Sequence, residues 1–413
     1  MYGSRHNVRD RARIDSKLLS ILALCEPTLL AAQTDDRNEA FRGSRFANDN
    51  IAISFGHIGD LSRTVSGGLQ RSTDYLHLWS AAAEFDTEGL FGWRDSTIRI
   101  DVLGTTGGDP GIDSVGDIQG LNNIEADDGW KIYEAWYEQS LSGGRTSIKA
   151  GIFDLNLEFD VIDTGILFIN SSHGMGPDFS QSGINGPSTF PTTAFGVRVR
   201  RQITDNIYLQ GALLDGVPGD PETFTGTHIE VGGSDGALKA IEGGIVTATA
   251  DGRRMKLALG AWRYSAGQSE DITRSPIAER NNAGLYALAE KSLFVEEADT
   301  AQGLAVFFRY GVADRALNPI ESYLGAGLVY TGALPGRPED QLGLAVAIAQ
   351  GAQRQRADDP NLSRAETAWE LTYRMPLTDW LTIQPNIQKI VDPGFSRTTG
   401  DALVVTMRAE LTF

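Results

Sequence analysis

The sequence predicts an all-β fold: a transmembrane antiparallel β-barrel of sixteen strands, with a long loop folded into the lumen. Three observations support this prediction. Apolar and polar residues alternate with a period of two along most of the chain, as in strands with one apolar and one polar face. The alternating segments are about ten residues long, which suits a tilted membrane crossing. Short turns and long polar links alternate between them.

The strands can be placed in order along the chain. Segments with the alternating pattern cover residues 73–86, 95–104, 130–140, 145–153, 195–203, 206–214, 240–250, 255–265, 284–293, 302–311, 321–331, 342–349, 366–374, 381–388 and 403–413. In the last of them Leu403, Val405, Met407, Ala409, Leu411 and Phe413 share one face. The fifteen segments imply a sixteenth, because single-chain bacterial barrels have even strand numbers.

A barrel explains the polar faces better than a soluble β-sandwich does. A sandwich would bury the apolar faces in a shared core and expose the Arg- and Glu-rich faces. A barrel reverses this, with polar residues around a wet lumen and apolar residues against lipid. The segments are also longer than the roughly five to six residues of an average soluble strand. A soluble sandwich or propeller remains the alternative fold.

The ends of the chain divide it into three expected regions. Residues 1–32 resemble a signal peptide, because a stretch with five basic residues precedes the apolar run from Leu18 to Ala32. An amphipathic helix of a cytosolic protein is the alternative for this segment. Residues 33–70 are expected to form a polar N-terminal segment, and residues 71–413 the barrel. No apolar run reaches the 18 residues of a transmembrane helix.

The links predict two different rims. Short links such as 141–144 and 204–206 have tight-turn composition and suit a periplasmic rim. Long polar links near 105–129, 154–194, 215–239, 266–283 and 351–364 suit the outer rim. The link 154–194 is too long for a turn and carries the apolar patch Ile166–Ile169. We expect this patch to pack against the inside of the barrel wall.

Several kinds of chemistry are disfavoured. The formal charge of -18 argues against a nucleic-acid partner, which requires a basic face. The five histidines show no paired metal-ligand spacing, so we expect no metal and no cofactor. Asp109, Asp113 and Asp117 could bind calcium, although a solvated acidic loop is the favoured reading. His173 beside Ser171 and Ser172 is the one candidate for nucleophilic catalysis, and it is disfavoured, so no enzyme is expected.

Three stretches resemble a known family. The first runs from Lys149 to Phe159 and continues at Leu167–Ser172. The second is Phe190–Pro191 with Ala194–Arg198. The third joins Glu366, Glu370–Leu371 and Tyr373–Arg374 to Trp380, Pro385–Gln388 and Asp392–Gly394. In their order and spacing these stretches, with the terminal Phe413, resemble the carbohydrate-selective porins of the OprB family over roughly residues 85–413.

The resemblance implies a function and a location. It implies passive, carbohydrate-selective diffusion of small sugars through a water-filled pore in the outer membrane of a Gram-negative bacterium. It also implies that a C-terminal aromatic residue, here Phe413, is read by the outer-membrane assembly machinery. Small sugars and outer-membrane lipid are then the expected partners, and the sequence leaves a homotrimer open. The alternative function is a secreted or soluble β-protein that binds carbohydrate.

The alternation also predicts residues of the pore wall. Sugars present hydroxyl groups and flat apolar faces, so charged groups and aromatic rings are expected to meet them. The inward-facing candidates are Arg99, Glu134, Trp136, Glu138, Lys149, Arg198, Arg200, Glu366, Glu370 and Arg374. For each of these taken singly, an ordinary solvated position in the lumen is the simpler reading.

Overall fold

The computed structural model describes residues 46–47, 50–233, 235–249, 252–265, 282–296, 301–352, 359 and 361–412. Its strands are β1 (Phe46–Ala47), β2 (Ile51–Gly68), β3 (Thr73–Asp86), β4 (Ser96–Thr106), β5 (Gly129–Leu141), β6 (Thr146–Phe153), β7 (Ala194–Gln202), β8 (Ile207–Asp215), β9 (Ala237–Ala248), β10 (Arg254–Tyr264), β11 (Ala283–Val295), β12 (Gly303–Ala313), β13 (Ile320–Thr331), β14 (Gln341–Gly351), β15 (Ala365–Thr378), β16 (Leu381–Val391) and β17 (Gly400–Thr412). Short helical segments are α3 (Thr87–Phe91), η1 (Gly111–Val115), η2 (Leu155–Leu157), η3 (Asp163–Leu167), η4 (Ser171–His173), α4 (Pro177–Ser180) and η5 (Pro393–Phe395). No helix among these residues is long and apolar enough to cross a bilayer.

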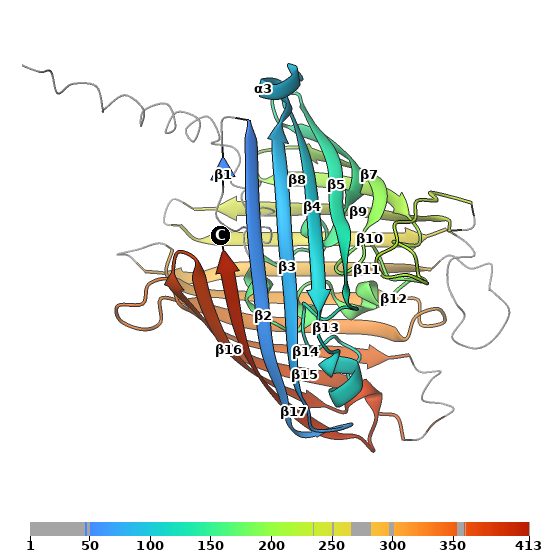
Figure 1. Ribbon diagram of the computed structural model, residues 1–413, viewed down its shortest axis with the longest axis vertical. Coiled ribbons are helices and arrows are strands. Elements are labelled where there is room, and N and C mark those ends of the chain that lie inside the picture. Colours follow the sequence, from blue (N-terminus) through green and yellow to red (C-terminus); the bar gives the residue numbers. More distant parts are fainter. Residues whose placement is uncertain are drawn as a thin grey trace, which may run out of the picture.

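The strands β2 to β17 form a closed antiparallel barrel. Each strand pairs with the next along the chain, and β17 returns to pair with β2, where Leu411 lies opposite His57. Figure 1 shows this closure, with the blue β2 beside the red β17. Closure leaves no strand edge of the barrel unpaired, which a sheet in lipid requires. The predicted sixteen-stranded barrel is therefore confirmed.

The two faces of the sheet have the predicted polarity. On β15 the outward side chains of Trp369 and Leu371 are 49% and 47% exposed, whereas Glu366 and Glu370 on the other face are at most 1% exposed. Large apolar side chains are exposed on the outside of many other strands as well. A soluble protein rarely exposes so extensive an apolar surface. The structure thus fits a lipid-facing exterior and not a β-sandwich.

The fifteen predicted segments all correspond to strands, and the missing sixteenth is β2. It lies within residues 33–70, so placing the start of the barrel at residue 71 was wrong. The outward face of β2 carries Gly59 and Arg63 among its apolar residues, and the inward face carries Ile58, which weakens the alternation. The predicted signal peptide, residues 1–32, lies outside the described residues, as does Phe413.

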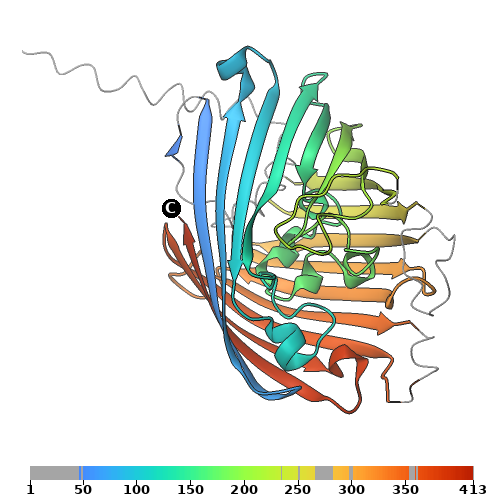
Figure 2. The same ribbon diagram turned by 45° about the vertical axis from the view of Figure 1, so that its right-hand side comes forward.

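The two ends of the barrel differ in their links. One end, here called the short-turn end, carries the links 142–145, 203–206 and 379–380. The opposite end, the long-loop end, carries the links 107–128, 154–193 and 216–236. Two of these long links turn into the barrel, where they appear as the teal and green segments inside the strands in Figure 2. Only 154–194 was expected to fold inward, and no such prediction was made for 105–129, so the inward course of 107–128 is an additional finding.

Candidate functional site

The candidate site is a cavity of about 1520 Å³ inside the barrel. Its walls come from the first inner loop (residues 107–128), the second inner loop (residues 154–193) and inward side chains of several strands. The two inner loops contact each other, since Asn123 N donates to Ile169 O (2.8 Å) and Ser171 N donates to Gly120 O (2.9 Å). They therefore narrow the lumen together.

Glutamates of the barrel wall hold the backbone of both inner loops. Glu370 on β15 accepts hydrogen bonds from Ile169 N (2.6 Å) and Asn170 N (3.0 Å). The other wall glutamates accept backbone N–H groups in the same way: Glu134 from Asp154, Glu242 from Asp160, Glu290 from Asp163 and Thr164, and Glu366 from Ile118, Gln119 and Gly394. A carboxylate that accepts two N–H groups satisfies donors that a loop cannot pair internally.

Two inward arginines bind the inner loops, Arg309 by ion pairs and Arg408 by hydrogen bonds. Arg309 on β12 is fully buried and binds Asp160 of the second inner loop through Nη2 (2.7 Å), as well as Asp178 of α4. Arg408 on β17 binds Asp60 of β2 (2.7 Å) and donates to Asn122 and Asn123 of the first inner loop. The ion pairs of Arg309 therefore hold the second inner loop, because a buried charge requires a partner. Arg408 is neutralised by the wall residue Asp60 and holds the first inner loop by hydrogen bonds.

Apolar packing seats the second inner loop against β10 to β14. Phe179 stacks on Trp262 with ring centroids 4.9 Å apart, and Phe168 lies 5.8 Å from Phe307. The inward positions of β14 are small, and a methyl group built on Gly343 would lie 2.7 Å from Leu167. The apolar patch Ile166–Ile169 thus packs where small wall residues leave room for it.

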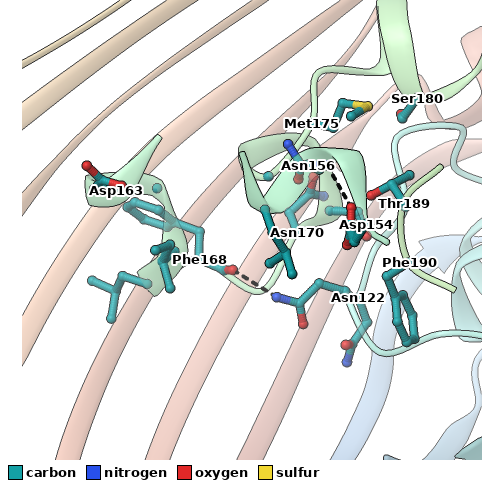
Figure 3. Close-up of a pocket in the computed structure, with 18 of the residues that line it drawn as sticks. Asn122, Asp154, Asn156, Asp163, Phe168, Asn170, Met175, Ser180, Thr189 and Phe190 are labelled. Atoms are coloured by element: carbon teal, nitrogen blue, oxygen red, sulfur yellow. Dashed lines mark hydrogen bonds between the residues drawn. The ribbon is translucent and has the colours of Figure 1, made fainter. Parts of the chain in front are cut away.

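The cavity lining combines amides, carboxylates, hydroxyls and aromatic rings. Figure 3 shows Asn122, Asp154, Asn156, Asn170 and Thr189 grouped around one space, with Phe168 on one side and Phe190 on the other. Tyr133 donates its hydroxyl to Asp154, and its ring packs edge-on near Phe190. Such groups donate to and accept from hydroxyls, and they also offer flat apolar faces.

Of the ten predicted wall residues, only Arg374 lines this cavity. It forms an ion pair with Glu410, which lines the cavity as well (3.0 Å). The wall glutamates Glu134, Glu366 and Glu370 point inward as predicted, but they are buried beneath the inner loops. They position the loops and offer no free surface to a solute.

Four other predicted residues belong to one buried ion-pair network. Lys149 and Arg198 both bind Glu138, and both also bind Glu158 of the second inner loop, where the Lys149 contact is 2.6 Å. Trp136 lies under the Lys149 ammonium, 4.1 Å from its ring centroid. The remaining two predicted residues also have partners in the wall: Arg99 contacts Asp101, Glu134 and Glu84, and Arg200 donates to Gln210.

The lining is mainly acidic. Eleven acidic and five basic side chains line the cavity. A lumen with an excess of carboxylates favours cations over anions and does not repel a neutral solute.

Most lining residues were not predicted, because they lie in the loops. Others, such as Gln384, Arg408 and Glu410, lie on the polar face of clearly alternating strands, and the alternation did not distinguish them from other inward residues. The unpredicted lining residues with polar or aromatic side chains include Asp101, Gln119, Asn122, Asn123, Tyr133, Asp154, Asn156, Asn170, Phe190, Lys256, Gln384, Arg408 and Glu410. The Asn-rich stretches of the inner loops were the available signal, but their position inside the barrel depends on tertiary packing.

The disfavoured catalytic candidate can be located, and a cluster of His228, Glu230 and Asp235 that was not singled out from the sequence lies elsewhere. His173 is fully buried beside Phe168 and Phe307, and burial lowers its pKa to about 3. Ser172 donates its hydroxyl to Gln119 O (3.0 Å) and not to the histidine. At the long-loop end, His228 Nε2 lies 2.6 Å from Asp235 and 3.9 Å from Glu230. His228 and Asp235 form a hydrogen bond here.

Known proteins resemble the chain in sequence. The profile of the carbohydrate-selective porin, OprB family, matches residues 70–413. Porin B of Pseudomonas aeruginosa is 24% identical over 86% of this chain and 86% of its own length. The putative porin QuiX of Acinetobacter baylyi is 22% identical over 80% of this chain and 81% of its own.

Solved structures resemble the chain in fold. The high-pH structure of Pseudomonas putida OprB superposes with a TM-score of 0.75 at 20% identity, covering 88% of this chain and 94% of that one. Its low-pH structure gives 0.58 at 19% identity, with 88% and 93% covered. A mutant of the porin of Rh. blastica gives 0.52 at 11% identity, with 88% and 100% covered. At these identities the superpositions establish a shared barrel fold.

Proposed function

The chain belongs to the carbohydrate-selective porin OprB family, and we propose that the cavity between its two inner loops is where it selects sugars. The protein is a channel for passive diffusion of small sugars. Family and fold together imply the outer membrane of a Gram-negative bacterium, and they point to a channel and not to an enzyme. What remains to be assigned is the part of the lumen that recognises the solute.

The proposal rests on one observation. The lumen is narrowed by the inner loops, and its lining combines hydroxyl-binding groups with partly exposed aromatic rings. Phe190 is partly exposed and lies close to Asp154 and Thr189. A pyranose can place its apolar face on such a ring while its hydroxyls meet the neighbouring oxygens. Weak contacts of this kind favour entry without delaying exit, as passage through a channel requires.

Liposome swelling tests this assignment. Vesicles containing the protein should swell faster in a neutral hexose than in a linear polyether of equal hydrodynamic radius. Phe190→Leu should reduce that difference, because it removes the flat ring but keeps an apolar side chain. Leu371→Ala, on the lipid-facing surface, is the matched control and should leave the difference unchanged. Equal rates for the hexose and the polyether in the wild type would sink the proposal.

The roles expected for lipid, for residues 1–32 and for Phe413 are proposals as well. We infer that outer-membrane lipid surrounds the apolar exterior, that residues 1–32 serve as a signal peptide and that Phe413 is an assembly signal. The exposed belt of apolar side chains supports contact with lipid. A homotrimer stays open, and chemical cross-linking in native membranes would decide it.

A further inference from the structure

One histidine and two carboxylates converge in the link 216–236 at the long-loop end. The Nε2 atom of His228 lies 2.6 Å from Asp235 Oδ2 and 3.9 Å from Glu230 Oε2. One ligand atom from each of the three residues lies within 4.8 Å of the other two. Among the residues that the structure describes, no other three histidine, cysteine or acidic side chains meet so closely. The three side chains can therefore face one small ion together.

The backbone of the link holds these side chains near one another. Gly232 and Gly236 exchange two backbone hydrogen bonds (2.7 and 3.0 Å), and this turn brings Asp235 back beside the other two residues. The buried carboxylate of Asp215, at the end of β8, accepts the N–H group of Glu230 (2.6 Å). The cluster is therefore attached to the barrel wall, which lowers the cost of ordering its side chains around an ion.

The charge of the link favours a cation. The link contains four carboxylates, those of Asp220, Glu222, Glu230 and Asp235, and it contains no lysine or arginine. Negative charges on one short segment repel each other, and a bound cation offsets that repulsion. The side chains of His228, Glu230 and Asp235 are 41%, 46% and 16% exposed, so a cation can reach them from the medium.

We propose that His228, Glu230 and Asp235 form a zinc site at the long-loop end of the pore. One imidazole nitrogen and two carboxylate oxygens suit Zn²⁺, which accepts both kinds of ligand at about 2.0–2.2 Å. The imidazole disfavours Ca²⁺ and Mg²⁺, which take oxygen ligands. Three protein ligands leave the fourth tetrahedral position to a water molecule. The spacing of the histidines did not predict this site, because it uses a single histidine.

Zinc binding requires only small movements of the three side chains. Ligand atoms around a tetrahedral zinc ion lie roughly 3.3–3.6 Å from one another. The separation of 3.9 Å between His228 and Glu230 contracts slightly, and that of 2.6 Å between His228 and Asp235 widens. The ion replaces the hydrogen bond between His228 and Asp235, and the imidazole then carries its proton on Nδ1. Because Nε2 must be unprotonated to bind the ion, affinity should fall as the pH is lowered.

The link that carries the site also borders the cavity. Asp220 and Glu222 line the cavity, and Asn185 of the second inner loop donates its side-chain N–H to Pro218 O (2.7 Å). A bound zinc ion adds two positive charges to a link with four carboxylates. Zn²⁺ added on the long-loop side should therefore lower the permeability ratio of K⁺ to Cl⁻.

The test measures binding of Zn²⁺ alone to the purified, untagged full chain after chelator treatment. Equilibrium dialysis should show a saturable site in the wild type, and any binding elsewhere on the chain cancels in the comparison with variants. His228→Ala and Asp235→Asn should each weaken this site about tenfold or more, because removing even a supporting residue costs about 10–100-fold. Glu222→Gln is the matched control, since it removes a carboxylate of the same link outside the cluster, and it should bind as the wild type does.

Ion selectivity in planar bilayers gives an independent readout, and heat-modifiable migration in SDS shows that each variant has folded. Zn²⁺ on the long-loop side should lower the K⁺ to Cl⁻ ratio of the wild type and of Glu222→Gln but not that of His228→Ala. A wild type without saturable binding, or His228→Ala with the affinity of the wild type, would overturn the proposal. A selectivity shift that persists in His228→Ala would place the ion elsewhere, and displacement of Zn²⁺ by an equal concentration of Ca²⁺ would contradict the ligand set; either result also overturns it.

Discussion

Arg374 and Glu410 are the residues through which the cavity lining can be tested by single charges. They project inward from β15 and β17, line the cavity and pair at 3.0 Å. Both are partly accessible, with side chains 29% and 10% exposed. Because the other lining charges are mostly acidic, removing either partner should shift the selectivity in a predictable direction.

Arg374→Gln should increase the permeability ratio of K⁺ to Cl⁻, and Glu410→Gln should decrease it. The change is expected to be about two- to fivefold, since one charge at contact in a solvated pore contributes about 1 kcal/mol. Reversal potentials in planar bilayers under a salt gradient measure the ratio. Asp205→Asn, in an exposed link at the short-turn end, is the control and should have little effect. A shift in the same direction for both variants would refute the assigned lining.

The wall glutamates show how far the sequence predicts the role of a single residue. The period of two placed Glu366 and Glu370 on the inward face correctly. It could not reveal that the N–H groups of Ile118 and Ile169 would meet them, because those contacts join residues about 200 or more positions apart. Residue spacing therefore predicted the direction of the side chains but not their partners. Five of the ten predicted wall residues proved to be loop anchors, namely Glu134, Lys149, Arg198, Glu366 and Glu370.

At the scale of elements, the second inner loop depends on Arg309. Arg309→Met should release this loop, because it leaves Asp160 and Asp178 buried without a counter-charge. Removing one partner of a buried ion pair typically costs about 3–5 kcal/mol. Faster proteolysis within residues 154–193 and a larger single-channel conductance are the expected results.

The matched control for this prediction also removes the carboxylate charges that Arg309→Met leaves unpaired. Arg309→Met combined with Asp160→Asn and Asp178→Asn should recover much of the protease resistance, since no buried charge is then left unpaired. Equal resistance of Arg309→Met and the wild type would mean that the apolar contacts of Phe168 and Phe179 hold the loop alone.

The terminal strand β17 leads to a prediction about insertion of the barrel into the outer membrane. β17 pairs with β2 as far as Thr412 and Gly56, so this pairing closes the barrel one residue before Phe413. Deleting Phe413 should lower the amount of barrel inserted in the outer membrane far more than it lowers the stability of barrel refolded in detergent. As an ordinary lipid-facing aromatic, it would contribute about 1–3 kcal/mol of burial. Insertion and refolded stability falling in proportion would contradict a role as an assembly signal.

For the whole molecule, the alternation of apolar and polar residues predicted the barrel. Tertiary packing determined where the two inner loops lie inside it. Fifteen strands followed from alternation, and β2 was missed because Gly59, Arg63 and Ile58 blur its two faces. The second inner loop carried an apolar patch that the small inward residues of β14 could accommodate. The first inner loop carried no comparable signal, because its buried apolar residues Val115, Leu121 and Ile124 are separated by polar residues and form no continuous patch.

The central claim, that sugars are selected in the cavity between the inner loops, is tested most directly by protection of an engineered thiol. Cys25 is the single cysteine of the sequence, so Phe190→Cys together with Cys25→Ser leaves one reactive site. A small charged thiol reagent should reduce the single-channel current of this variant, and a neutral hexose should slow that reaction in a saturable way. The same thiol at Leu371, on the outer surface, should react without changing the current. A current unaffected by modification at position 190, or a reaction that the hexose does not slow, would contradict the claim.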